Sequence, residues 1–319
     1  MAMGLKNRSE ATTEDVAKAI RRSKVHWQST LFSVVLLLLL LTTLVILFVL
    51  LADIIVKAYP TFQERGLSFV TSGLSLNPET AGVFTGIVGS LVIALIVVLL
   101  AFPIGMSTAI YLEEYAAASR FNRFLDTTVR NLAGVPSIVY GLLGLAMFVP
   151  LVRMMGLGGS TDGKNVIAAG ITMSALVLPI VIITSSEAIR AVPNSIREAG
   201  FGVGATKWEV IRSHVMPVAL PGILTGTVLT LARAIGETAP LLVIGVATGY
   251  FAPPGDATIL DQLTGAYTAL PVVVFSWTRQ TQGEFAETLA PAAIVVLLGV
   301  LFILNGAAIW LRNRTEKKW

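Results

Sequence analysis

Two charged residues, Arg233 and Glu237, stand four positions apart in a stretch that otherwise has the composition of a membrane span. On an α-helix this spacing places both side chains on one face, where they can pair. A rise of about 1.5 Å per residue puts Arg233 about 18 Å beyond Pro221, near the middle of a bilayer. A charge at that depth costs at least about 2.5–3.5 kcal/mol, so both groups should face a bundle interior or a water-filled cavity.

Two interpretations of this pair stay open. The pair is either a buried clamp between helices, or it lines a substrate path in which the guanidinium binds an anion when the carboxylate releases it. A clamp alone is often no more stable than apolar packing, and this favours the path. Gly236 and Pro240 lie beside the pair and predict a break in the helix, which is common at transport sites.

The other reactive residue types exclude several kinds of site. The chain has no cysteine, and His26 and His214 are far apart, so neither thiol chemistry nor a histidine metal site is expected. Residues 158–165 (GGSTDGKN) nearly match a phosphate-binding P-loop, but Asn165 stands where a hydroxyl must contact Mg²⁺, and no buried strand precedes it. We therefore expect a turn there, and any coupling to ATP must come from a partner.

The elements that must position these residues are helices in a membrane. Hydrophobic residues make up 55% of the 319 residues and charged residues only 13%, and the mean hydropathy of +0.79 excludes a water-soluble enzyme. The net charge of +4 comes from basic residues beside apolar runs, so a lipid surface rather than nucleic acid is the expected partner. About 20 apolar residues cross a bilayer. The sequence predicts an all-α integral membrane protein with six transmembrane helices: 31–52, 80–112 with a bend at Pro103, 131–152, 165–186, a fifth from Pro217, and 288–311.

The distribution of basic residues predicts the orientation of these spans. With the N-terminus in the cytoplasm, seventeen of the 23 Lys and Arg residues fall in inner segments and five in outer segments. Both termini are therefore expected in the cytoplasm. Residues 262–278 are charge-free but short and contain Pro271, so we predict an interfacial or re-entrant segment rather than a seventh span. Tyr267 and Trp277 are expected at the level of the lipid headgroups.

The chain divides into a basic N-terminal segment (1–30), a first helix with its outer loop (31–81), a core (82–311) and a tail (312–319). Residues 12–24 predict a basic helix at the cytoplasmic surface, which is typical of a topology anchor. Small residues spaced by four occur at Gly222 and Gly226, and at Gly82, Gly86 and Ser90. They allow helices to approach closely, either within the chain or between subunits.

The inner loop 187–215 is unusually long and predicts two short helices. The first covers 196–201 and is broken by Gly202 and Gly204. The second is capped by Thr206 and Glu209. This spacing alone fits either an amphipathic surface loop or a helical hairpin that inserts into a groove of another protein.

The residues of this loop resemble the EAA loop of ABC-importer permeases, in which it forms the coupling helix that docks on the ATPase subunit. The matching positions are Glu198, Ala199, Gly200, Gly204, Ala205, Ile211 and Pro221. Gly200 stands where the commonest form has alanine, and we expect this to loosen the first helix slightly. Segments 131–145, 178–193 and 231–242 are similar to phosphate-transport permeases of the PstA type, and the similarity covers about 82–314.

The resemblance implies a type I importer permease fold (MetI-like) in the bacterial inner membrane, with no catalytic site. It implies four kinds of partner: a second permease of the PstC type, a dimer of ATP-binding subunits of the PstB type, an extracytoplasmic phosphate-binding protein of the PstS type, and membrane lipid. ATP and Mg²⁺ would be bound by the partner ATPase, so this chain needs no cofactor. Arg233, Glu237 and Arg190 match residues of the phosphate path, although Arg190 fits a purely topological role equally well.

We therefore expect a permease subunit that forms half of the path of an ATP-driven importer for inorganic phosphate. The nearest alternative substrate is another oxyanion such as sulfate, because an arginine alone does not distinguish the two. A proton-coupled carrier with Glu237 as relay is an alternative from another class, and it would transport without ATP. A non-transporting membrane scaffold is a third, in which the Arg233–Glu237 pair is only a clamp.

Overall fold

The computed structural model describes residues 27–116, 119–246 and 259–315, so the basic helix expected within 12–24 lies outside the described residues. The chain forms two compact units, Met1–Asp53 and Ile54–Trp319. Every regular element in the described ranges is helical, and most are α-helices (α), the others being 3₁₀ or π-helical turns (η). In chain order they are α2 (Trp27–Arg65), α3 (Ser68–Thr71), α4 (Phe84–Ile110), η1 (Tyr111–Tyr115), α5 (Arg120–Ala133), α6 (Ser137–Leu143), η2 (Gly144–Phe148), α7 (Val149–Val152), η3 (Arg153–Leu157), η4 (Gly159–Thr161), α8 (Val166–Arg190), α9 (Asn194–Gly202), α10 (Lys207–Val210), η5 (Ile211–Val215), α11 (Met216–Gly236), α12 (Ala239–Ile244), α13 (Ile259–Thr264), α14 (Leu270–Trp277), η6 (Phe285–Leu289) and α15 (Ala290–Thr315).

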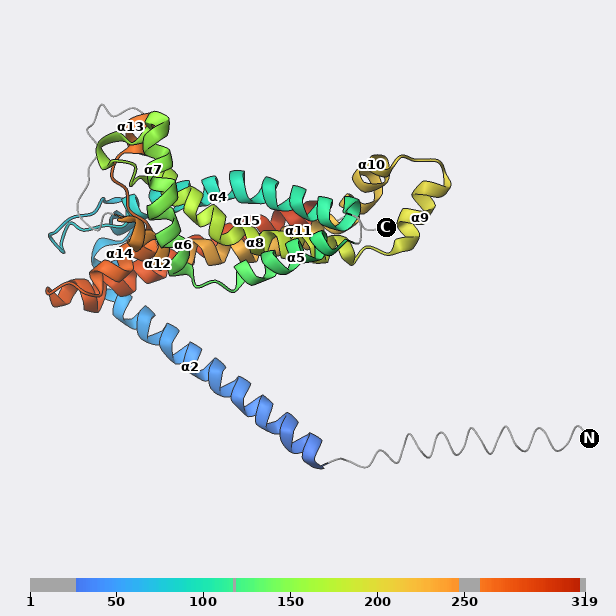
Figure 1. Ribbon diagram of the computed structural model, residues 1–319. Helices are drawn as coiled ribbons and strands as arrows, with labels where there is room; N and C mark the ends of the chain where they lie inside the picture. Colours follow the sequence, from blue (N-terminus) through green and yellow to red (C-terminus); the bar gives the residue numbers. More distant parts are fainter. Residues whose placement is uncertain (1–26, 117–118, 247–258, 316–319) are drawn as a thin grey trace, which may run out of the picture. The chain divides into compact units, whose positions relative to one another are not determined.

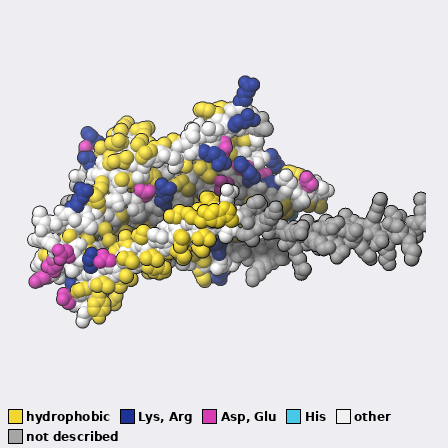
Figure 2. All heavy atoms as spheres, turned by 90° about the horizontal axis from the view of Figure 1, so that it is seen from below, with side chains coloured by type: hydrophobic (Ala, Val, Ile, Leu, Met, Phe, Trp, Pro, Cys, Tyr) yellow, Lys and Arg dark blue, Asp and Glu magenta, His cyan; other side chains and the backbone are white. Residues whose placement is uncertain are grey.

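Six helices are long and apolar enough to cross a membrane, which confirms the predicted number of spans and the all-α class. Within the described ranges they are Trp27–Arg65, Phe84–Tyr115, Ser137–Leu157, Val166–Arg190, Lys207–Gly236 and Phe285–Arg314. Their side chains leave broad hydrophobic areas on the molecular surface, as Figure 2 shows for one face. Such areas are expected of a protein whose solvent is lipid.

The boundaries of several spans differ from the predicted ones. The third begins at Ser137 instead of 131, because residues 131–133 end α5 and the Gly134–Pro136 turn separates the two helices. The second runs through Pro103 without interruption. The fifth begins at Lys207, since α10, η5 and α11 are continuous, and α8 extends to Arg190. The connector between these two long spans is therefore only 191–206, shorter than the loop expected over 187–215.

In the first unit, the described residues belong to α2 and their side chains are exposed. Two polar side chains in the apolar stretch satisfy themselves locally. The hydroxyl of Thr42 donates to the Leu38 carbonyl at 2.8 Å, and the hydroxyl of Thr43 donates to the Leu39 carbonyl at 2.9 Å. No polar side-chain group of these two threonines is therefore left unpaired against lipid.

The second unit is a bundle in which α4, α8, α11 and α15 run alongside one another (Figure 1). The helices α9 and α10 project from one end of this bundle, and α12 and α14 lie toward the other end. α8 is the most buried span, because α4 packs along one side of it and α11 along another. Its Met173 and Val177 are fully buried in the largest core cluster.

The small residues at fourfold spacing pack within the chain. A Cβ on Gly226 would lie 2.5 Å from Cβ of Thr184, and one on Gly222 would lie 3.0 Å from Cβ of Ala188, so α11 lies directly against α8. In α4, the Ser90 hydroxyl accepts a hydrogen bond from the Leu270 backbone N–H at 2.8 Å. Of the two alternatives for these residues, close packing inside the subunit is therefore the one that the fold uses.

Residues 262–278 contain α14 and most of α13, both far shorter than a span. The expectation that Tyr267 and Trp277 lie at the lipid headgroups is wrong, because their exposed fractions are only 7% and 3%. Trp277 packs against Phe69 and Phe285, and Tyr267 belongs to the main core. Burial raises the pKa of the Tyr267 hydroxyl, which therefore stays protonated.

The segment 158–165 forms a turn that starts α8. The preceding element is the helical turn η3, whereas a P-loop follows a strand. The buried Asn165 caps α8: its side-chain oxygen accepts from the Ala168 N–H at 3.2 Å and its amide donates to the Leu157 carbonyl at 2.7 Å. Asn165 is thus a helix cap, which explains why an amide stands at this position.

Gly226→Ala should destabilise the purified subunit by about 1–3 kcal/mol, because the added methyl group collides with the Cβ of Thr184 and forces α11 away from α8. The unfolding temperature in detergent measures the effect. Gly299→Ala is the matched control, since Gly299 also lies in a spanning helix and a Cβ there meets nothing within 4 Å. Equal unfolding temperatures for the two variants would contradict the packing described here.

Candidate functional site

The end of α11 carries the predicted charged pair. Arg233 lies in the last turn of α11, which ends at Gly236, and Glu237 is the first residue outside the helix, with extended backbone (φ −78°, ψ 121°). The guanidinium Nε donates to Glu237 Oε1 at 3.4 Å. The predicted pairing and helix break are both present. The pair forms across the end of the helix, however, and not along its face.

The break has a physical cause in the sequence. Pro240 lacks a backbone N–H, and its ring would collide with the carbonyl of the residue four positions earlier, which is Gly236. Gly236 has itself a low helix propensity. The chain therefore leaves the helix for two residues and resumes as α12 at Ala239. Glu237 is carried into the gap between the two helices, where its carboxylate turns back toward Arg233.

The guanidinium of Arg233 is not enclosed by its own chain. Its side chain is 58% exposed, whereas that of Glu237 is 21% exposed. A charge-assisted hydrogen bond is usually about 2.7–2.9 Å long, so the 3.4 Å contact is a loose one. Arginine carries five N–H donors, and within the described residues Glu237 is the only ion-pair partner of Arg233. The remaining donors are free to bind an oxyanion.

Arg190 lies at the last position of α8 and forms a two-point contact with Glu113 of η1. Its Nη2 donates to Oε1 at 2.6 Å and its Nε donates to Oε2 at 3.1 Å. The structure does not bring Arg190 and Arg233 together. α8 ends where α9 begins, whereas Arg233 lies about 26 Å along α11 from Met216, toward α12 (Figure 1). The three predicted path residues therefore form two separate sites.

The connector forms the predicted pair of short helices, α9 and α10. Gly204 has φ +80°, in the left-handed region that glycine adopts without strain, and it turns the chain between them. Thr206 and Glu209 form the expected capping box: the Glu209 carboxylate accepts from the Thr206 N–H at 2.7 Å, and the Thr206 hydroxyl accepts from the Glu209 N–H at 3.4 Å.

The residues that match the EAA loop separate into two groups. Glu198 and Ala199 are exposed on α9, whereas Gly200, Ala205 and Ile211 face the protein interior. Pro221 lies inside α11, one turn into the membrane-spanning part. The expectation that Gly200 loosens the first helix is wrong. A Cβ there would lie 2.8 Å from Val210 Cγ2, so the glycine lets α9 pack closely on α10.

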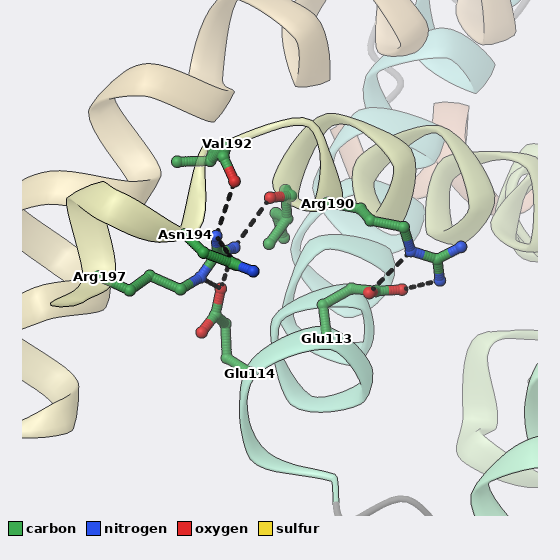
Figure 3. Close-up of polar contacts among 7 residues, drawn as sticks. Glu113, Glu114, Arg190, Val192, Asn194 and Arg197 are labelled. Carbon is green, nitrogen blue, oxygen red and sulfur yellow. Dashed lines mark hydrogen bonds and ion pairs between the residues drawn. The ribbon is translucent and has the colours of Figure 1, made fainter.

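Three residues at this end of the bundle were missed by the sequence analysis. Glu113, Glu114 and Arg197 form ion pairs with partners 77 and 83 positions away (Figure 3). The sequence offered one signal, since two consecutive acidic residues end a long apolar stretch at Glu113 and Glu114. Counting basic residues for topology treated Arg190 and Arg197 as interchangeable surface charges, and this concealed their partners.

No cluster of three or more His, Asp or Glu side chains that could hold a metal ion occurs in the described ranges. The polar groups in the bundle are arginine–carboxylate pairs and hydroxyls bonded to carbonyls of their own helices, such as Thr172 and Thr230. This chemistry fits recognition of an anion better than coordination of a cation.

Residues 101–316 match the family described as binding-protein-dependent transport system inner membrane component. This segment contains both sites and the connector between α8 and α11. The chain belongs to this family. It is therefore a multi-pass component of a binding-protein-dependent importer, a family of non-catalytic transmembrane subunits whose transporters also contain an ATPase and a binding protein.

Individual relatives agree with this assignment. The chain is 35% identical over 232 residues to phosphate transport system permease protein PstA 1 of Mycobacterium tuberculosis, covering 72% of this chain and 70% of that protein. A bacterial alginate ABC transporter, solved with an alginate-bound periplasmic protein, has a chain with a TM-score of 0.62 at 15% identity, covering 92% of this chain and 99% of that one. The MetNI methionine ABC transporter gives a TM-score of 0.57 at 17% identity over 74% of this chain and 96% of the other. These structures confirm the type I importer fold.

Thr206→Ala should fray the start of α10, because it removes the side-chain acceptor for the Glu209 N–H, at a cost of about 1 kcal/mol. Hydrogen–deuterium exchange of amides 207–210 measures this, and we expect severalfold faster exchange than in the unmodified protein. Thr206→Ser is the control, since its hydroxyl keeps the cap. Identical exchange in both variants would show that the cap contributes nothing to the connector.

Proposed function

We propose that this chain is the transmembrane permease subunit of an ATP-driven importer for inorganic phosphate, and that it forms half of the translocation path. The observation that carries the proposal is the Arg233–Glu237 pair at the break between α11 and α12. The similarity to PstA 1 of Mycobacterium tuberculosis supports phosphate as the substrate. The solved structures support only the fold.

The exposure of Arg233 supports its place on the path. A guanidinium that faces lipid in the bilayer interior is unfavourable by several kcal/mol, so its 58% exposed surface must face water or a second subunit. A second permease of the PstC type, packed against this face, would enclose an aqueous route between the subunits. Glu237 balances the arginine charge when no substrate is present, and phosphate replaces the carboxylate during passage.

The connector supports the coupling role. α9 and the turn after it project from one end of the bundle and expose large apolar side chains, namely Phe201 at 50%, Val203 at 83% and Trp208 at 54% (Figure 1). Exposed apolar groups at a projecting hairpin are typical of a protein contact. We propose that a dimer of ATP-binding subunits of the PstB type docks here, with ATP and Mg²⁺ bound by those subunits.

The remaining parts of the proposal follow from the charge distribution and from this docking site. α9 and α10, and both termini, lie on the cytoplasmic side, where most of the basic residues gather. The opposite end of the bundle receives phosphate from an extracytoplasmic binding protein of the PstS type. Closure of the ATPase dimer moves the connector and tilts the core helices, which opens a cavity at Arg233 toward the outside. Arg190 contributes to the path near its cytoplasmic end.

Arg233→Gln should lower phosphate uptake by about a hundredfold or more, because a desolvated oxyanion loses its charged donor. Uptake is measured in proteoliposomes that contain the complete complex, with ATP inside and binding protein with phosphate outside. Arg153→Gln is the matched control, since Arg153 also pairs with a carboxylate, Asp162, at 3.1 Å but lies away from α11. We expect normal uptake and normal assembly in the control.

Several outcomes would overturn the proposal. Normal phosphate uptake in an assembled Arg233→Gln complex would remove Arg233 from the path. Uptake of sulfate but not phosphate by the unmodified complex would change the substrate. Phosphate uptake by this chain alone, driven by a pH gradient and independent of ATP, would show a proton-coupled carrier.

Gly204→Ala should lower the phosphate imported per ATP hydrolysed by severalfold, because a Cβ at φ +80° is strained by about 1–2 kcal/mol and changes the angle between α9 and α10. The same proteoliposomes measure both quantities. Gly202→Ala is the control, because both glycines have open space around them and only Gly204 has positive φ. Unchanged coupling in Gly204→Ala would contradict the docking role of the hairpin.

A further inference from the structure

We propose that Glu114 and Arg197 are positioning residues that transmit the movement of α9 to the core helix α4. Their ion pair joins the helix that projects from the bundle to the π-helical turn η1 at the end of α4 (Figure 3). The inference rests on the proposed function, since it assumes that an ATPase moves α9. It adds the route by which that movement enters the bundle.

η1 contacts three successive elements through three consecutive residues. Glu113 pairs with Arg190 of α8, Glu114 pairs with Arg197 of α9, and the ring of Tyr115 lies 5.0 Å from Nζ of Lys207 in α10. We call these three residues the η1 cluster. π-Helical turns are rare and occur frequently at functional sites. Because η1 continues α4 without a break, any displacement of the cluster displaces α4.

Arg197 makes the most extensive contacts with this region. Its Nε and Nη2 donate to Glu114 Oε1 at 3.0 and 2.7 Å. Its Nη1 donates to the Val192 carbonyl at 2.7 Å, and Nη2 donates to the Ile189 carbonyl at 3.0 Å. The two carbonyls belong to the end of α8 and the turn after it, where helical acceptors lack intrahelical partners. One side chain therefore joins α9 to both α4 and α8.

The environment of this pair differs from that of the other ion pairs. The side chains of Arg197 and Glu114 are 18% and 8% exposed, whereas Arg190 is 58% exposed beside Glu113, and Arg153 and Asp162 are 65% and 71% exposed. Water screens an exposed pair and weakens it, but a largely buried pair with all donors engaged holds one geometry. Among the described residues, the Glu114–Arg197 pair is the most enclosed link between the connector and the bundle.

The rest of the connector does not fix α9 as firmly. α9 has only nine residues, and Gly204 with positive φ follows it at the start of the next turn. Close packing of Gly200 on Val210 holds α9 to α10, but not to α4. Without the Glu114–Arg197 pair, α9 could rotate on its two flanking turns while α4 stayed in place. The ATPase would then hydrolyse ATP without moving the core helices.

The experiment compares Glu114→Gln and Arg197→Gln with the unmodified complex in proteoliposomes containing all subunits. Binding-protein-stimulated ATP hydrolysis and phosphate uptake are measured in the same vesicles. We expect assembly and hydrolysis to persist while phosphate imported per ATP falls by at least about tenfold, because a small misplacement of a remote element has effects of this size. Asp162→Asn is the control, since it removes an exposed pair at another place, and it should leave the ratio unchanged.

A second variant separates transmission from simple stability. The chain contains no cysteine, so Glu114→Cys combined with Arg197→Cys introduces the only two thiols of this subunit. We expect the reduced double variant to be uncoupled, and a short reversible bis-methanethiosulfonate cross-link to restore most of the phosphate imported per ATP. Reduction should abolish it again. The unmodified complex, treated with the same reagent, controls for thiols on other subunits.

The outcomes are distinct. If the single variants assemble and keep the full ratio, or if uptake and hydrolysis fall in strict proportion, the transmission role is wrong. If the single variants do not assemble, the cross-linked double variant decides, and no recovery on cross-linking overturns the proposal. If the unmodified complex hydrolyses ATP but imports no phosphate, the proposed substrate fails, and this result is independent of how the Glu114 variants behave.

Discussion

Guanidinium groups carry a permanent charge, and a membrane protein can place them only beside a carboxylate or in contact with water. The second unit of this chain follows that constraint at Arg190, Arg197 and Arg233, each of which pairs with a glutamate. In two of these pairs the glutamate comes from an element far away in the sequence. The pairs therefore determine which helix ends meet, and the positions of α8, α9 and η1 relative to one another depend on them.

The degree of burial gives these similar pairs different properties. A mostly enclosed pair such as Glu114–Arg197 has no access to competing ions and behaves as a fixed joint. The more exposed guanidiniums of Arg190 and Arg233 keep free surface on which an anion can compete with the carboxylate. The same pair of residue types thus serves as a mechanical connection at one place and as an exchangeable anion site at another.

Close helix packing supplies the rigidity on which this arrangement depends. α8 lies in the middle of the bundle, and the small side chains of Ala188 and Thr184 face the glycines of α11. In lipid, packing of this kind replaces the hydrophobic effect as the source of helix association. A bundle held in this way transmits a displacement of one end of α4 or α11 along the whole helix, because a packed core does not deform continuously.

The sequence alone determined the class of the protein, the number of spans, the break after Gly236 and the helical hairpin with its Thr206–Glu209 cap. Each of these depends on local properties, namely runs of apolar residues, the missing N–H of proline, and side chains that reach their own backbone. Only the tertiary structure decided that Tyr267 and Trp277 are buried, that Gly200 tightens the hairpin, and that Glu113 and Glu114 select Arg190 and Arg197. These contacts join residues far apart in the chain, and neither periodicity nor a count of charges specifies which distant side chains meet.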